Sequence, residues 1–165
     1  MPVKLGSKLP ADNEARIEII PLIEGATYLF ANEYEAARIE QKTGWSSADI
    51  AGMVDTRVTT LGPDGARVER RGEAPVTVKV AEEDRKADPT GVGDAFRAGF
   101  LAGQAWGVGD ERSAQVGALL ATYVIETIGT QEYELARTHF LERMARTYGD
   151  DAAAEVEPHV SCPRP

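Results

Sequence analysis

Hydrophobic and polar positions alternate along the chain at two spacings, which predict strands and helices. Short apolar or alternating runs predict strands at residues 27–31, 57–61, 66–70 and 76–80. Runs at helical spacing, with capping residues before them, predict helices ending near residues 25 and 53, and at 33–43, 92–106, 111–127 and 134–148. Strands that alternate with helices early, followed by stacked helices, predict an α/β layered fold with a mainly parallel sheet.

The ends of the chain differ from this body. Residues 1–13 mix Pro, Gly, Ser and charged residues without periodicity, and residues 149–165 have the same character. We therefore expect a loose N-terminal segment and a disordered tail. Residues 14–148 form the one predicted domain, and a chain of this length can bury a core without disulfides or structural metals.

Composition excludes several classes of protein. The 165 residues include 18 Lys and Arg against 27 Asp and Glu, a formal net charge of −9, which argues against binding to nucleic acid or to an anionic membrane. No apolar run approaches the roughly 18 residues of a membrane span, and the first ten residues lack a signal-peptide core. Cys162 is the only cysteine, so no internal disulfide forms, and we expect a cytoplasmic protein.

The chemically informative segment is Asp88–Leu101, which reads DPTGVGDAFRAGFL. Gly91 and Gly93 lie where a loop turns into a helix, so backbone amides and the helix dipole can bind an anion such as phosphate. Asp94 follows in the first helical turn, where a carboxylate can accept a proton from an attacking hydroxyl. The structural alternative is a tight helix entry with an aspartate that only complements the dipole.

The commoner phosphate-binding loops do not fit this segment. No Gly-Lys-Ser or Gly-Lys-Thr follows a glycine loop, and Phe96 occupies the place of the third glycine of the dinucleotide fingerprint. Small residues continue along the same helix, among them Ala95, Gly99 and Ala102, and they permit close packing against a sheet or another helix.

Four motifs in order resemble the ribokinase-like (PfkB-type) family of sugar and nucleoside kinases. Asp88–Phe96 is similar to its C-terminal signature D-T-x-G-A-G-D, and Asn32–Glu35 to its N-x-x-E motif. Thr60–Gly65 is similar to its T-x-G-x-x-G nucleotide-binding turn, and Gly129–Gln131 to a short loop that holds a monovalent cation in some members. The residues around two of these motifs, NEYEAARIEQKTGW and GTQEY, look most similar to bacterial adenosine-kinase-like members.

The resemblance implies an ATP-dependent phosphotransferase with Asp94 as its general base. It implies that amides of Gly91, Val92 and Gly93 form the anion hole for the γ-phosphate. It places the ATP site along Thr60, Gly62 and Gly65. Asn32 and Glu35 would position Mg²⁺ indirectly. The implied ligands of a K⁺ ion are Asp88, Thr90, Thr127 and Gly129.

Other readings of these residues stay open. Asn32 can be a helix cap, and Thr60–Gly65 can be only a hairpin turn. Arg97 can contact phosphate or be an ordinary ion-paired residue, and His139 has no neighbour at metal-ligand spacing. The chain departs from the family pattern at Ala118, where an adenine-contacting Asn is frequent, and at Tyr133, where a small hydroxyl residue is frequent.

Family members are roughly twice this length, so the resemblance covers the C-terminal, nucleotide-binding half of a ribokinase-like fold. We expect transfer of the γ-phosphoryl group to a hydroxyl of a sugar or nucleoside, with adenosine favoured. The alternative is a non-catalytic nucleotide-binding or oligomerisation module that lacks the substrate-binding half. Either way, a second copy or a complementary N-terminal half is the expected protein partner.

Overall fold

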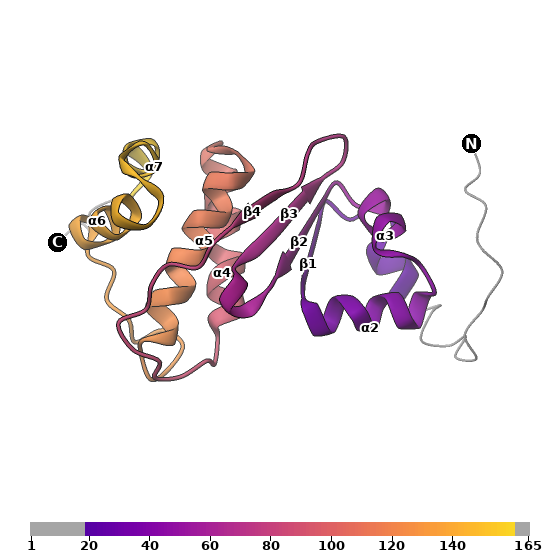
Figure 1. Cartoon of the computed structure of the whole chain (residues 1–165), viewed down its shortest axis with the longest axis horizontal. Helices are drawn as coiled ribbons and strands as arrows, with labels where there is room; N and C mark the ends of the chain where they lie inside the picture. Colours follow the sequence, from indigo (N-terminus) through magenta and orange to yellow (C-terminus); the bar gives the residue numbers. More distant parts are fainter. Residues whose placement is uncertain (1–18, 161–165) are drawn as a thin grey trace. The chain divides into compact units, whose positions relative to one another are not determined.

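The computed structural model describes residues 19–160, so the loose segment expected at residues 1–13 lies outside the described residues. The chain divides into two units. Their helices and strands are labelled in Figure 1. The first comprises the described residues up to Thr60 together with Glu69–Pro75. The second comprises Leu61–Val68 and the described residues from Val76 onward.

The sheet has four strands in the order β1–β2–β3–β4. The strands are β1 (Tyr28–Asn32), β2 (Thr56–Thr60), β3 (Ala66–Arg70) and β4 (Val76–Val78). β1 and β2 pair in parallel because helices connect them, whereas β3 and β4 pair antiparallel because only residues 71–75 connect them. The α/β class is confirmed, but the pairing is mixed, and β4 ends two residues before the predicted strand does.

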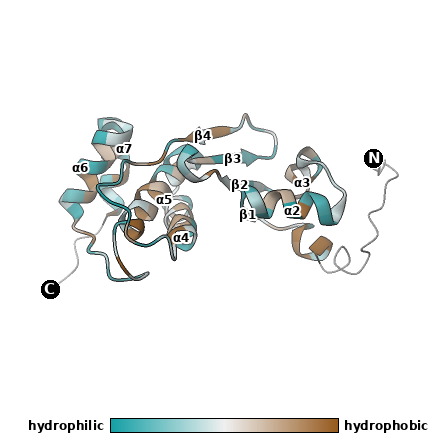
Figure 2. Cartoon of the chain, turned by 60° about the horizontal axis from the view of Figure 1, so that its bottom comes forward, coloured by the Kyte–Doolittle hydropathy of each residue, from teal (hydrophilic) through white to brown (hydrophobic). Residues whose placement is uncertain are grey.

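Two capped helices build the first unit, α2 (Glu33–Thr43) and α3 (Ser47–Met53). Each begins with a capping box, in which the cap side chain and the third helical residue satisfy each other's backbone amides. α2 ends where Gly44 adopts the left-handed conformation. α2 is coloured mainly teal because polar residues form its exposed face (Figure 2). The core beneath these helices contains Ile23, Trp45, Ile50 and Val54.

A tight turn, η1 (Gly62–Asp64), precedes β3 in the second unit. Gly65 follows with a φ of 95°, and an added Cβ would lie 1.9 Å from the carbonyl oxygen of Val78. The Leu61 amide donates to the Gly65 carbonyl over 2.8 Å. A side chain at residue 65 is therefore incompatible with the β3–β4 pairing.

Helices make up most of the second unit. They are α4 (Val92–Trp106), α5 (Gly109–Ile125), α6 (Arg137–Tyr148), α7 (Asp150–Val156) and the short η2 (Glu157–His159). α4 matches the predicted range. α5 begins and ends two residues before its predicted range, and α6 begins three residues after its predicted start, because no side chain caps the start of either helix.

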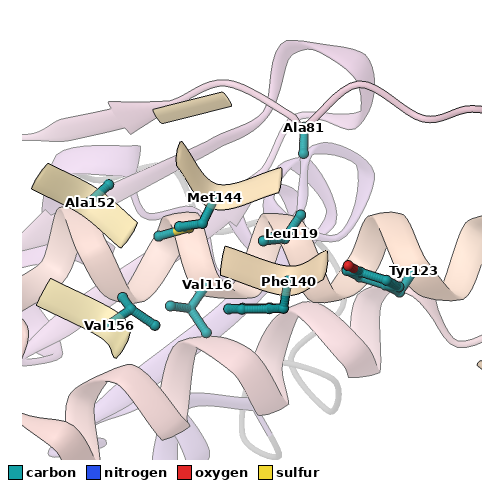
Figure 3. Packing of buried hydrophobic residues seen from close by; sticks show 8 residues of the cluster. All are labelled: Ala81, Val116, Leu119, Tyr123, Phe140, Met144, Ala152 and Val156. Carbon is teal, nitrogen blue, oxygen red and sulfur yellow. The ribbon is translucent and has the colours of Figure 1, made fainter. Parts of the chain in front are cut away.

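The tail from residue 149 was expected to be disordered, and this expectation is wrong for residues 150–160. α7 packs onto α6, and the buried side chains of Ala152 and Val156 join a core with Phe140 and Met144 (Figure 3). Val116 and Leu119 of α5 complete the same cluster. The sequence of this helix contains three alanines and one valine, so it has no strong apolar pattern. The helix is stabilised by burial of these small side chains against a neighbouring helix. Cys162 lies outside the described residues.

Candidate active site

The helix entry at Gly91 is the segment that the sequence predicts to bind an anion. Gly91 is the N-cap of α4 with a φ of 82°, and no side chain caps the helix. The Val92 amide donates to the Pro89 carbonyl over 3.3 Å. Within residues 19–160, no acceptor is found for the amides of Gly93 or Asp94. These two donors of the first turn are thus free to bind a ligand.

Asp94 projects from the same turn into solvent. Its side chain is 82% exposed, and its Oδ1 pairs with Nη1 of Arg97 over 3.1 Å, one helical turn further along. The ion-paired reading of Arg97 is therefore confirmed. No packed side chain covers the Asp94 carboxylate, so a reacting hydroxyl can reach it.

A second loop lies against this turn. An added Cβ at Gly91 would lie 2.8 Å from the Thr130 methyl carbon, so Thr130 lies beside this turn. The Asp88 carboxylate accepts a hydrogen bond from the Thr90 amide over 2.8 Å. Hydrogen bonds from Thr90, and a smaller one from the Gly129 amide, lower the pKa of Asp88. Three of the four residues expected to bind K⁺ are thus neighbours.

Thr127, the fourth of these residues, already uses its hydroxyl. The Thr127 Oγ1 donates to the Tyr123 carbonyl over 3.0 Å, and its amide donates to the Val124 carbonyl. Thr127 lies just past the end of α5 rather than inside the predicted helix. The bond to the Tyr123 carbonyl uses the hydroxyl proton, so the backbone oxygen and the lone pairs of the hydroxyl oxygen remain for a ligand.

Two candidate residues of the first unit form a helix cap. The Glu35 amide donates to Asn32 Oδ1 over 2.8 Å, and the Asn32 amide donates to Glu35 Oε2 over 2.9 Å. The capping reading of Asn32 is therefore confirmed, and this capping box orients both side chains at the end of β1. Glu35 Oε1 has no partner among the described residues.

The nucleotide-turn candidates occupy the connection between β2 and β3. Thr60 ends β2, Gly62 begins η1 with a φ of 56°, and Gly65 follows it. The segment is thus a turn between neighbouring strands, and its role in nucleotide binding stays a prediction. The turn accounts for both glycines, whose positive φ angles disfavour other residues.

The remaining sequence candidates range from exposed His139 to buried Ala118. His139 Nδ1 lies 3.0 Å from the Tyr123 hydroxyl, and Ala118 is buried within α5. Tyr133 packs at the margin of the α5–α6 core. Among residues 19–160, no three His, Cys, Asp or Glu side chains gather closely enough to hold a metal ion directly. In the same range, no helix is both long enough and apolar enough to traverse a bilayer.

The sequence analysis did not identify a buried ion pair between Glu126, at the end of α5, and Arg143 of α6. Arg143 is 1% exposed, and its Nη1 and Nη2 donate to Glu126 Oε2 and Oε1 over 2.8 and 2.6 Å. Burial alone would raise the pKa of Glu126, but hydrogen bonds from Arg143 and the Asp84 amide leave that pKa below its ordinary value. The available signal was the position of Arg143 between Phe140 and Met144 on the apolar face of its helix.

Comparison with known proteins decides the family. The model of the pfkB family of carbohydrate kinases matches residues 6–136. The chain belongs to the pfkB family. A relative in this family is the nucleoside kinase of Methanocaldococcus jannaschii, 29% identical over 113 residues, which cover 68% of this chain and 37% of the relative. The chain thus spans well under half the length of that relative.

Solved structures of nucleoside kinases share the fold of this pfkB-family chain. The structure of the M. jannaschii nucleoside kinase aligns with a TM-score of 0.74 at 27% identity, covering 79% of this chain and 44% of that one. The Burkholderia thailandensis nucleoside kinase in complex with inosine aligns with a TM-score of 0.72 at 32% identity, covering 80% and 46%. The adenosine kinase of Sinorhizobium meliloti aligns with a TM-score of 0.61 at 29% identity, covering 73% and 37%.

Proposed function

We propose that this chain is the nucleotide-binding and catalytic-base half of an ATP-dependent sugar or nucleoside kinase. The observation that carries the proposal is the exposed Asp94 carboxylate in the same helical turn as the unpaired amides of Gly93 and Asp94. An anion site and a proton acceptor are the two protein contributions that phosphoryl transfer requires. Their close placement supports this chemistry over a purely structural helix entry.

In the proposed reaction, Asp94 takes the proton of the acceptor hydroxyl as its oxygen attacks the γ-phosphorus of ATP. The bond between the γ-phosphorus and the β–γ bridging oxygen breaks, and ADP leaves with that oxygen. In the turn formed by Gly91, Val92 and Gly93, the Val92 amide already donates to the Pro89 carbonyl, so the transferred group is bound by the amides of Gly93 and Asp94. The positive end of the α4 dipole assists them. Arg97 must release Asp94, or move with it, when substrate binds.

The other candidate ligands enter the same proposal. Thr60, Gly62 and Gly65 contact the nucleotide. Asn32 and Glu35 would position Mg²⁺ indirectly, and the bound ion would neutralise charge on the phosphates. The neighbouring carboxylate and backbone oxygens of Asp88, Thr90, Thr127 and Gly129 suit a monovalent cation such as K⁺. Carboxylate and carbonyl oxygens are the donors that hard cations prefer.

Adenosine is the acceptor that we propose, and inosine is its nearest competitor. The support is similarity: matched structures include an adenosine kinase and a nucleoside kinase with inosine. The second candidate function is a nucleotide-binding module without turnover. The observation that favours it is that the chain covers only 37% of the matched nucleoside kinase.

The test is phosphorylation of adenosine, inosine and ribose by the chain with Mg-ATP, measured with and without a complementary N-terminal half from a relative. We expect Asp94→Asn to lower turnover by about 10²- to 10⁴-fold, the usual effect of losing a positioned base. Mg-ATP affinity, measured by calorimetry, should survive because the amides remain. Undiminished turnover in this variant would refute the base assignment.

Asp151→Asn is the matched control. Asp151 lies in the first turn of α7, so the variant removes a similar helix-dipole interaction away from the proposed site. Its turnover should equal that of the parent chain. If the chain binds Mg-ATP but phosphorylates no acceptor under any condition, the nucleotide-binding module is supported instead. If it neither binds Mg-ATP nor phosphorylates an acceptor, both the kinase and the module are contradicted.

A further inference from the structure

Residues 84–88, which lead into the proposed anion-binding turn, form several hydrogen bonds with the end of α5. The amides of Ala87 and Asp88 both donate to the Ile125 carbonyl, over 2.7 and 3.2 Å. Arg85 Nε donates to the Glu126 carbonyl over 2.7 Å. Residues 84–88 therefore run along the C-terminal end of α5 although about forty residues of sequence separate them.

The Glu126–Arg143 ion pair lies at the centre of these contacts. The Glu126 carboxylate accepts from the Asp84 amide over 2.7 Å, while Arg143 Nη2 donates to the Glu82 carbonyl over 2.8 Å. The Arg143 guanidinium also stacks over the Tyr123 ring, 4.9 Å from its centroid. Each charged partner thus binds the other and one backbone group of residues 82–84.

These contacts join three segments. α6 contributes Arg143, the end of α5 contributes Glu126, and the loop contributes backbone groups only. A buried pair adds little to stability relative to well-packed apolar residues of similar volume, because desolvation offsets its attraction. Directional contacts of both partners to one loop are better explained by positioning that loop.

We infer that Glu126 and Arg143 are positioning residues, which form a clamp that holds residues 82–88 and thereby sets the anion-binding turn for its phosphate. The inference rests on the proposed function, because the phosphate ligand is part of that proposal. The clamp acts through Asp88, whose carboxylate binds the Thr90 amide immediately before Gly91. Loss of the clamp should therefore loosen the loop and weaken binding of the nucleotide phosphates.

The test compares Glu126→Gln, and the double variant Glu126→Leu with Arg143→Met, against the parent chain. The double variant removes both charges together, so neither is left buried and unpaired. Hydrogen exchange at the Ala87 and Asp88 amides measures loop opening, and calorimetry measures Mg-ATP affinity. We expect exchange to accelerate roughly ten- to a hundredfold and affinity to fall about tenfold, the effect of losing charge-assisted hydrogen bonds.

The matched control is Arg112→Met with Glu155→Leu. Arg112 Nε pairs with Glu155 Oε2 over 2.8 Å and joins α5 to α7 without touching residues 82–88. This variant should lower the melting temperature without changing exchange at Ala87 or Asp88 or the affinity for Mg-ATP. Equal changes in both double variants would assign the clamp a merely structural role and overturn the inference.

The remaining outcomes separate the two claims. Mg-ATP affinity that stays at the parent value in the clamp variants overturns the positioning role and leaves the proposed function intact. A parent chain that does not bind Mg-ATP contradicts the proposed function. In that case the exchange comparison alone decides whether the pair holds the loop, and unchanged exchange overturns the clamp.

Discussion

Gly93 is a glycine that no packing contact explains. Its backbone is not in the positive-φ region, and an added Cβ would meet nothing within 4 Å. Gly91 and Gly65, by contrast, have positive φ angles and close neighbours. A glycine kept in an open helical position carries an entropic cost, so the observation favours a ligand that approaches this backbone closely.

Gly93→Ala should therefore separate stability from binding. We expect the free energy of unfolding to rise by up to about 0.5–1 kcal/mol, because alanine is the better helix former. Mg-ATP affinity should fall by tenfold or more, roughly the loss of one charge-assisted hydrogen bond. Chemical denaturation and calorimetry measure the two effects.

Gly52→Ala serves as the control for this prediction. Gly52 lies in α3, has no positive φ and has no atom within 4 Å of an added Cβ. The variant should gain stability without any change in Mg-ATP affinity. Unchanged affinity in Gly93→Ala as well would argue that the anion does not approach the Gly93 amide.

At the scale of elements, α4 and α5 approach one another through small residues. An added Cβ at Gly99 would lie 2.7 Å from the Gly117 Cα, and one at Gly103 would lie 2.6 Å from the Ser113 Cα. The predicted close packing of small α4 residues is thus confirmed at Gly99, whereas Ala98, which belongs to the same predicted set, is exposed. This close approach fixes the direction of α4, whose first residues form the proposed anion-binding turn.

We predict that Gly117→Ala destabilises the second unit. The new Cβ would lie 2.7 Å from the carbonyl oxygen of Phe96, a backbone atom that cannot move without shifting α4. Overpacking of this kind costs about 1–3 kcal/mol in unfolding free energy, which denaturation measures. Gly52→Ala is again the control, and a stability equal to the parent in Gly117→Ala would contradict the close helix contact.

At the scale of the whole molecule, stability should depend on pH through the buried ion pair. Glu126 has a lowered pKa in the folded protein, against an ordinary value of 4.5. A carboxyl of this kind stabilises the fold fully above its unfolded pKa, and the contribution is lost as the pH falls through the folded pKa. The clamp should therefore weaken in acid and not in alkali.

The measurement is the difference in unfolding free energy between the parent chain and Glu126→Gln. We expect this difference to be constant from about pH 6 to 8 and to shrink below about pH 4.5, where Glu126 becomes protonated in the unfolded chain first. A difference that does not change between pH 6 and 3 would show that the charge of Glu126 does not stabilise the fold.

Local sequence was sufficient for much of this protein. The bounds of α2 and α4 follow from Asn32, Gly44 and the glycines around residue 91, because caps and left-handed glycines act within a few residues. The four family motifs lie in short segments for the same reason, so the family and the identity of the candidate site residues were accessible without coordinates.

Tertiary packing decided the rest, because it depends on residues that are distant along the chain. α7 is ordered through the contacts of Ala152 and Val156 with α6, which no local pattern reveals. The clamp joins Glu82, Glu126 and Arg143, and an arginine in a helical pattern does not disclose its partners. Nor can sequence show that the Gly93 amide is unpaired and the Asp94 carboxylate exposed, since both follow from how the chain folds around them.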